Sequence, residues 1–115
     1  MEKRFEISLL FDFYGELLTE KQKDIMDLYF NNDLSLSEIA EINNTSRQAT
    51  HDTIKTCEKA LLVYEEKLKL LSKDYKLKET LKKIVSELDN LQIDIKDEKM
   101  NQLIYDIKTQ IIGNI

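Results

Sequence analysis

Apolar residues recur every three or four positions along most of the chain, which is the spacing of amphipathic helices. The first run predicts a helix over about residues 4–18, with an inward face made of Phe5, Leu9, Leu10, Phe13, Tyr14 and Leu17. In "TEKQ", Thr19 and Gln22 then form a capping box, which opens a second helix. This second helix ends at "NND" and turns inward Ile25, Leu28 and Tyr29.

A short third helix begins at another capping box, Ser35 with Glu38, and carries Ile39, Ala40 and Ile42. The stretch "NNTS" at 43–46 breaks the pattern, because asparagine tolerates turn and left-handed geometry better than most residues. A fourth helix follows this break. Its cap is either Ser46 or Thr45, the latter forming a third capping box with Gln48.

The fourth helix is the longest element that the pattern predicts. It continues through "ALLVYEEKLKLL" to about Leu71, a length of roughly 39 Å at the usual rise per residue. At 100° per residue, one side collects Ala49, Thr53, Cys57, Ala60, Tyr64 and Leu68, with Ile54 and Leu61 at its edge. The opposite side carries Gln48, His51, Lys55 and Lys59, and Arg47 lies at the border near the helix start.

After "SKDYK" the pattern predicts two more helices, separated by "DIKDEK". Their stripes are Leu77, Leu81, Ile84, Leu88 and Leu91 in one and Met100, Leu103, Ile104, Ile107 and Ile111 in the other. Two helices alone cannot bury so much apolar surface, so we expect a homodimer. The predicted organisation is a helical domain at 1–71 and a C-terminal helical extension at 72–115 that serves packing and oligomerisation.

Composition supports an all-α protein and excludes several function classes. The 115 residues include no proline and only two glycines. One cysteine, Cys57, permits no internal disulfide and fits a reducing cytoplasm, and His51 is the only histidine, so no zinc site is expected. Acidic residues interrupt the first apolar run, so we expect no signal peptide and no membrane insertion. Without a Gly-rich phosphate loop or a recognisable catalytic constellation, neither a cofactor nor enzymatic activity is expected.

Charge is distributed unevenly along the chain. The net charge is −5, with residues 1–45 at −6, residues 46–71 at +1 and residues 72–115 at zero. The one segment that leans positive contains the start of the fourth helix, which permits a local footprint for a polyanion.

A short helix, a polar turn and a capped helix form the helix-turn-helix arrangement, in which a small residue such as Ala40 lets the second helix cross closely over the first. Arginine can bind guanine through two hydrogen bonds, glutamine can pair with adenine, and serine or threonine serves either partner. The helix start at Ser46 can also offer N–H groups to a phosphate. The competing interpretation is an ordinary solvated face, with Lys55 in local salt bridges to Asp52 or Glu58.

Two resemblances favour nucleic acid. Residues 18–61 resemble the promoter-binding fourth region of bacterial sigma factors, in "LTEKQ", "LSLSEIA" and "SRQA". Nearly the whole chain resembles the YlxM family of small Gram-positive helix-turn-helix proteins, in "FDFYGELLTEKQ", "DLSLSEIAE" and "SRQATHDTIK". Thr50 stands where the sigma pattern usually has an aliphatic residue, so we expect looser packing between the two helices there.

The resemblance to the YlxM family implies a DNA-binding regulator linked to the signal recognition particle pathway by gene neighbourhood. It also implies a recognition helix over about residues 46–71. The candidate contacts are Ser46, Arg47, Gln48, Thr50, His51, Lys55 and Lys59. A second hypothesis is an adaptor for a protein or ribonucleoprotein, such as a signal recognition particle component. The acidic first 45 residues favour this adaptor, because phosphates would repel them.

Overall fold

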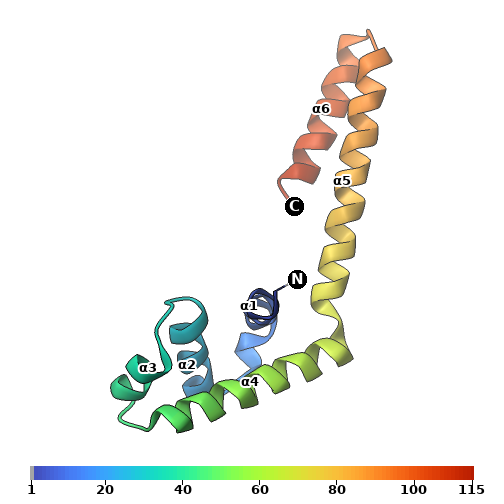
Figure 1. Cartoon of the computed structure of the whole chain (residues 1–115). Coiled ribbons are helices and arrows are strands. Elements are labelled where there is room, and N and C mark those ends of the chain that lie inside the picture. Colours follow the sequence, from blue (N-terminus) through green and yellow to red (C-terminus); the bar gives the residue numbers. More distant parts are fainter. Residues whose placement is uncertain (1) are drawn as a thin grey trace. The chain divides into compact units, whose positions relative to one another are not determined.

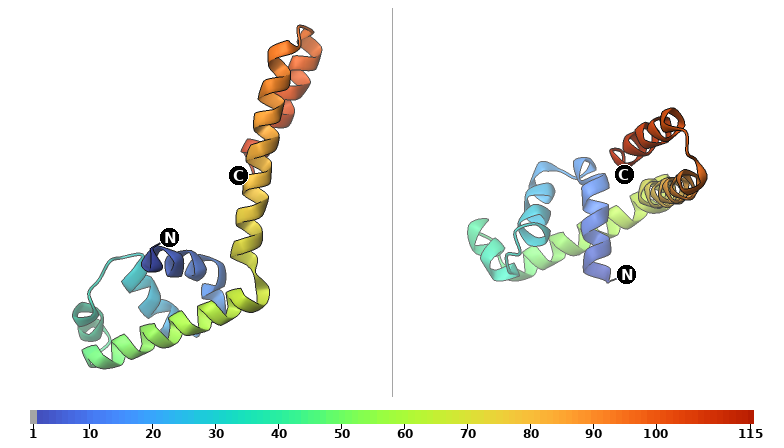
Figure 2. Two further views of the ribbon diagram at one scale, coloured as in Figure 1. Left: turned by 45° about the vertical axis from the view of Figure 1, so that its right-hand side comes forward. Right: turned by 90° about the horizontal axis from the view of Figure 1, so that it is seen from above.

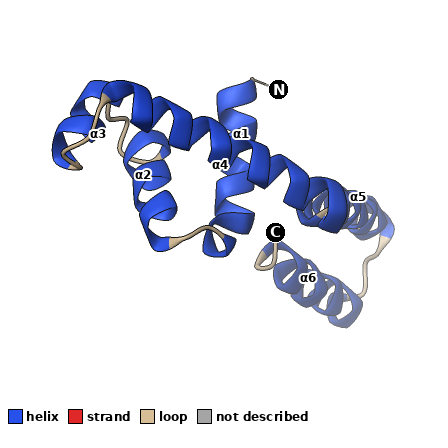
Figure 3. Ribbon diagram, turned by 90° about the horizontal axis from the view of Figure 1, so that it is seen from below, coloured by secondary structure: helices blue, strands red, loops and turns tan. Residues whose placement is uncertain are grey.

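The computed structural model describes residues 2–115 and shows an all-helical chain, which confirms the predicted fold class. Figure 3 shows helices and loops, with no strand in the described part. The helices are α1 (Lys3–Tyr14), η1 (Gly15–Leu17, a 3₁₀ turn), α2 (Glu20–Phe30), α3 (Leu36–Ile42), α4 (Arg47–Leu68), α5 (Leu70–Asp94) and α6 (Glu98–Ile112). Within the described range, no helix combines the length and the apolar character needed to cross a bilayer.

The chain divides into two compact units, one ending at Leu71 and one formed by Ser72–Ile115. In the first unit, α1, α2 and α3 all pack against α4, and α1 crosses over it (Figures 1 and 2). The core lies between these helices, and its fully buried members are Ile7, Leu10, Tyr14, Met26, Ile39, Cys57 and Leu61. The long helix α4 is therefore a shared platform for three shorter ones.

The first helix is shorter than predicted, and its buried face is rotated from the predicted one, although Leu10 and Tyr14 are buried as predicted. It ends at Tyr14, where the chain tightens into η1, and Gly15 lies against the Phe11 ring. A Cβ on Gly15 would come within 2.9 Å of that ring, so only glycine lets the ring seat there. The predicted inward residues Phe5 and Leu17 are each 55% exposed. Ile7 and Phe11, which were not predicted to face inward, join Leu10 and Tyr14 in the core.

The end of the long fourth helix was also predicted wrongly, because α4 ends at Leu68 and "SKDYK" lies inside α5. The break is at Lys69, which has left-handed geometry (φ 56°). The Tyr14 hydroxyl donates to Glu65 Oε1 at 2.6 Å and accepts from the Leu70 N–H at 3.0 Å. Glu65 Oε1 also accepts from the Leu71 N–H at 3.0 Å. Burial, and then the hydrogen bond to Glu65, raise the pKa of Tyr14. The phenol therefore stays protonated and can donate its hydrogen bond to Glu65 beside the break at Lys69.

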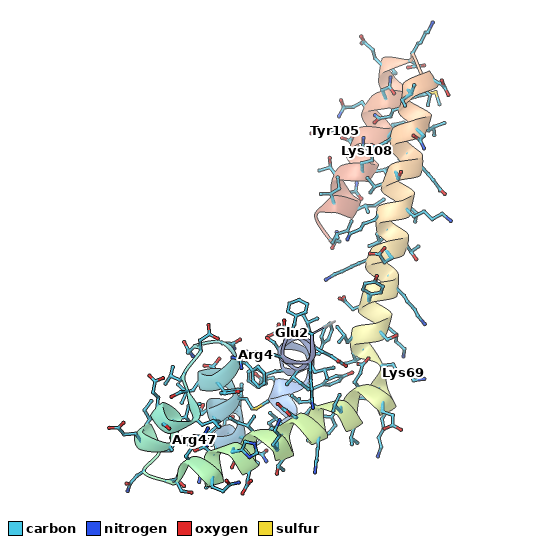
Figure 4. All side chains as sticks on the ribbon, in the orientation of Figure 1. Glu2, Arg4, Arg47, Lys69, Tyr105 and Lys108 are labelled. Carbon is cyan, nitrogen blue, oxygen red and sulfur yellow. The ribbon has the colours of Figure 1, made fainter. Side chains whose placement is uncertain are left out.

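The second unit is a helical hairpin formed by α5 and α6 (Figure 1). Asp97 caps α6 by accepting from the Lys99 and Met100 N–H groups. Lys108 on α6 reaches α5, where it forms an ion pair with Asp89 and donates to Gln92 Oε1 at 2.7 Å (Figure 4). Ile104 is the one buried hydrophobic residue of this unit, so the hairpin has almost no core of its own.

Candidate nucleic-acid interface

The turn between α3 and α4 has the geometry of a helix-turn-helix. The Thr45 N–H donates to Ala40 O at 3.0 Å and the Asn44 N–H donates to Glu41 O at 3.3 Å. Asn44 is left-handed, with φ 53°. These bonds and this dihedral define a Schellman motif, which ends α3 sharply and starts the next helix after a short turn. The predicted break at "NNTS" is confirmed at Asn44, and Ala40 is buried against its neighbours as expected.

Ser46, rather than Thr45, caps α4. Its hydroxyl accepts from the Ala49 N–H at 3.0 Å. The expected capping box of Thr45 with Gln48 does not form, because the Gln48 side chain instead donates to Asp52 Oδ1 at 2.9 Å. The first turn of α4 still leaves backbone N–H groups at its start, the usual place for a phosphate oxygen.

The buried face of α4 is rotated slightly from the predicted one. The side chains that enter the core are Thr50, Ile54, Cys57, Glu58 and Leu61. Ala49 is exposed and Leu68 is 46% exposed, although both were expected to face inward. The rotation places Asp52 near the middle of the outward face, beside Gln48 and Lys59.

Thr50 does not belong to the candidate interface. It is 1% exposed, and its hydroxyl donates to Ser46 O at 3.2 Å. A residue without accessible surface cannot reach a base or a phosphate, so the prediction for Thr50 was wrong. The burial of Thr50 also contradicts the expectation of looser packing at this position. Threonine can occupy a position that is usually aliphatic because its hydroxyl forms a hydrogen bond within its own helix.

Two predicted contacts share an acidic neighbour. The His51 side chain is 44% exposed, and its Nδ1 lies 3.5 Å from Asp52 Oδ1. That nitrogen is shielded from solvent and has no hydrogen-bond partner among residues 2–115. Gln48 is held by the same carboxylate. Asp52 therefore fixes Gln48 while adding a negative charge that phosphates would meet.

The cations of α4 differ in how free they are. Arg47 and Lys59 are exposed, and neither has an ion pair within the described residues; Arg47 lies at the start of α4 (Figure 4). Lys55 is half exposed and lies 3.3 Å from Glu58 Oε2. The Glu58 side chain is only 12% exposed, so Lys55 neutralises a largely buried carboxylate and is less free to leave it than Arg47 or Lys59 is to move.

Packing adds cations that the sequence pattern did not indicate. Lys21 of α2 lines a shallow groove with Asp52, Thr53 and Thr56 of α4. On the other side, Lys3 lies in a groove with Lys55 and Glu58. Lys21 stands between Glu20 and Asp24 in sequence, so no run of charge marks it, and only the packing of α2 on α4 reveals it.

Arg4 shares the groove of Lys3 but has a structural role. Its guanidinium donates to Tyr29 O at 2.7 Å, pairs with Asp33 at 3.2 Å, and lies over the rings of Tyr29 and Phe30. Cys57, on the inward side of α4, is a packing residue because it is fully buried in the core, and burial and the nearby Glu58 raise the pKa of its thiol. Neither side chain is placed to bind a polyanion.

Together these residues define the α4 face: Arg47, Gln48, His51, Lys55 and Lys59, with Ser46 at its start and Lys21 beside it. A Schellman turn, a capped second helix and an open polar face are the features of a helix-turn-helix protein. No group of three or more metal-ligating side chains occurs in the described range.

Comparison with known proteins identifies the family. Residues 1–107 match the model of the UPF0122 family, described as "Putative helix-turn-helix protein, YlxM / p13 like". A UPF0122 protein of Clostridium perfringens (strain SM101) is 56% identical over 110 residues, covering 90% of this chain and 98% of the relative. One of Clostridium kluyveri is 47% identical over 115 residues, covering both chains completely, and one of Clostridium acetobutylicum is 53% identical over 112 residues, covering 96% of each. The chain belongs to the UPF0122 family, which confirms the resemblance to YlxM proteins.

Proposed function

We propose that the protein is a non-enzymatic regulator that binds DNA, or RNA, with the α4 face. The observation that supports this most is the exposure of Arg47, Gln48 and Lys59 on the helix that follows a Schellman turn, while the opposite side of that helix is buried. A single helix fits the major groove of duplex DNA, and the N-terminal turns of a recognition helix are those that reach base edges.

The residues of the α4 face divide by chemistry. Arg47, Lys55 and Lys59, with Lys21 beside them, would contact phosphates, and the helix start at Ser46 would add N–H donors. Gln48 and the exposed edge of His51 are suited to base edges. Because Asp52 holds Gln48 and stands among these cations, the electrostatic attraction of one copy is modest.

We extend the proposal to a homodimer acting in the cytoplasm. Two copies on one nucleic acid double the number of cations engaged, which compensates for the small number on each. The exposed apolar side chains of the second unit provide a surface for such pairing.

The double variant Arg47→Glu/Lys55→Glu tests the nucleic-acid proposal. Reversing both cations should weaken the binding of duplex DNA at low salt by at least about 100-fold, because two attractions become repulsions on the contact face. Fluorescence anisotropy with a labelled duplex pool, recovered from DNA or RNA that co-purifies with the protein, measures the loss.

The matched control is Lys67→Glu/Lys96→Glu. It changes the net charge equally, at two exposed lysines that form no ion pair within the described chain and lie outside the α4 face. Circular dichroism should be the same for all three proteins. Equal weakening by both double variants would mean that only net charge matters, and would overturn the proposed face.

A second candidate is an adaptor that docks on a basic protein or ribonucleoprotein. It is supported by the net charge of −6 in residues 1–45 and by Asp52 near the middle of the α4 outward side. A role alongside the signal recognition particle, which the resemblance to YlxM proteins implies, belongs here. Binding of signal recognition particle components that survives Arg47→Glu/Lys55→Glu would favour this adaptor over the regulator.

A further inference from the structure

The hairpin of α5 and α6 exposes one apolar face. On α5, Leu77, Ile84 and Leu91 recur every seven residues and are 58%, 37% and 51% exposed. On α6, Met100, Leu103 and Ile107 are 51%, 63% and 46% exposed. We call these six residues the hairpin face.

Helical geometry places both sets on the same side of the hairpin. The α5 residues that turn toward α6 include Leu88 and Gln92, and the α6 residues that turn toward α5 include Ile104 and Lys108. Relative to these directions, Leu77, Ile84 and Leu91 lie to one side on α5. Met100, Leu103 and Ile107 lie to that same side on the antiparallel α6. The face is therefore continuous, with Leu81 and Leu88 half-buried along its floor.

The size of the hairpin face calls for a partner. The fourteen helical steps from Leu77 to Leu91 span about 21 Å, and two helices side by side are about 20 Å wide, so the face covers roughly 400 Å² in projection. An uncovered apolar patch of that size marks an interaction site. The hairpin has Ile104 as its one buried hydrophobic residue, and two such hairpins packed face to face would make a four-helix bundle.

Charge along α5 identifies the occupant and its direction. On the border of the stripe away from α6, the residues before Ile84 are basic (Lys73, Lys76 and Lys83), and those after it are acidic (Glu87 and Asp94). None of these five has an ion pair within residues 2–115. A second copy running antiparallel sets each basic half against an acidic half, whereas a parallel copy would set like charges together. The sequence of charges is thus complementary to its own reverse.

We propose that the hairpin face binds a second copy of this chain, with the two α5 helices antiparallel, and with Ile84 at the two-fold axis. Leu77 then packs against Leu91 of the partner subunit, and Lys73 faces Asp94 of the partner subunit. Because this contact rests on the self-association proposed above but uses no residue of α4, it can fail while nucleic-acid binding stands, and the reverse.

Cross-linking tests the position of the axis. Full-length Ile84→Cys should be joined to a covalent dimer by a short bifunctional maleimide, because its two copies meet. Ile93→Cys is the matched control, since Ile93 is 79% exposed on the same helix but points away from the hairpin face. The native Cys57 is buried and should not react in either protein. Linking at Ile93 but not at Ile84 would overturn the arrangement.

Sedimentation equilibrium tests the occupant. The wild-type chain of 13.6 kDa should sediment as a dimer at about 50 µM, and Ile84→Lys should lower the association constant at least about 100-fold, because it brings two like charges together at the axis. Circular dichroism checks that the variant keeps its helices. A monomeric wild type would overturn both the self-association and the face. A dimer that Ile84→Lys leaves intact would overturn the face alone. A face that is covered only when a different protein is added would also overturn it.

Discussion

Single positions on α4 show how far residue-level prediction reaches. The exposure of Arg47, Gln48 and Lys59 could be predicted, because charged and amide side chains avoid burial. The burial of Thr50 could not be predicted. Threonine occurs both at the surface and in a core, where its hydroxyl can form a hydrogen bond within its own helix. A small error in the predicted rotation of the helix was enough to place Ala49 inward and Thr50 outward, the reverse of what the structure shows.

Replacing Asp52 by asparagine should strengthen nucleic-acid binding. The substituted amide would keep an oxygen for the Gln48 side chain while removing a negative charge from the outward side of α4. One unit charge near a phosphate in water is worth about 1 kcal/mol, so we expect affinity to rise about fivefold at low salt. The same anisotropy titration measures the change.

The chain contains a matched control for Asp52→Asn. Asp106 on α6 accepts from the Gln102 side chain at 2.9 Å, the same spacing and distance as Gln48 with Asp52. Asp106→Asn removes the same charge from the second unit and should leave the affinity nearly unchanged. If Asp52→Asn weakened nucleic-acid binding instead, Asp52 would be a contact that accepts a hydrogen bond from a base amino group, and the repulsion argued here would be wrong.

Helix ends could be predicted where a local cap determines them. The boxes of Thr19 with Gln22 and of Ser35 with Glu38 both form as predicted, since each involves residues three apart. The ends at Tyr14 and Leu68 could not be predicted, because they depend on contacts distant in sequence. Tyr14 reaches the N–H of Leu70, 56 residues further along, and no local pattern records that bond.

The two capping boxes should respond differently to acid. Hydrogen bonds from Ser35, first from its backbone N–H, lower the pKa of Glu38. A lowered pKa in the folded state stabilises it at pH values above the ordinary glutamate pKa of about 4.3, and this contribution is lost as pH falls through the lowered pKa. The wild type should therefore be more stable than Glu38→Gln at pH 7, and the difference should shrink toward pH 3. Urea unfolding at both pH values measures it.

The box of α2 supplies the reciprocal control, because Gln22 does not titrate. Gln22→Glu should gain a pH-dependent contribution of the same sign that Glu38→Gln loses. A wild-type advantage over Glu38→Gln that stays constant from pH 7 to pH 3 would show that the Glu38 charge contributes nothing at this cap.

At the scale of the whole molecule, the helix count and the presence of exposed stripes in the last 44 residues could be predicted. Which side chains from other helices lie beside each surface could not be predicted. The approach of Lys21 to α4 depends on how α2 packs, and the one-sidedness of the hairpin face depends on how α5 and α6 pair. Both features depend on how two helices pack against each other, and the periodicity of one helix contains no information about that packing.

Salt dependence should report the number of copies on the nucleic acid. Each copy has four cations that would contact phosphates: Arg47, Lys55, Lys59 and Lys21. They imply a slope of log affinity against log salt of about −3.6 for one copy and about −7 for two. Wild type should show the steeper slope and Ile84→Lys the shallower one, measured by anisotropy between about 50 and 200 mM salt. Identical slopes would separate dimerisation from nucleic-acid binding.

The corner at Lys69 determines how the protein can be dissected. The division between the units falls after Leu71, at the start of α5, while the N–H groups of Leu70 and Leu71 are already held by Tyr14 and Glu65. A shortened chain that stops at Leu71 would keep the N–H groups of Leu70 and Leu71 but would lose the helical turns of α5 that hold them in place. Because starting a helix is the costly step, these two residues alone would not keep a helical conformation. A truncation that is meant to isolate the first unit should therefore extend a few turns into α5.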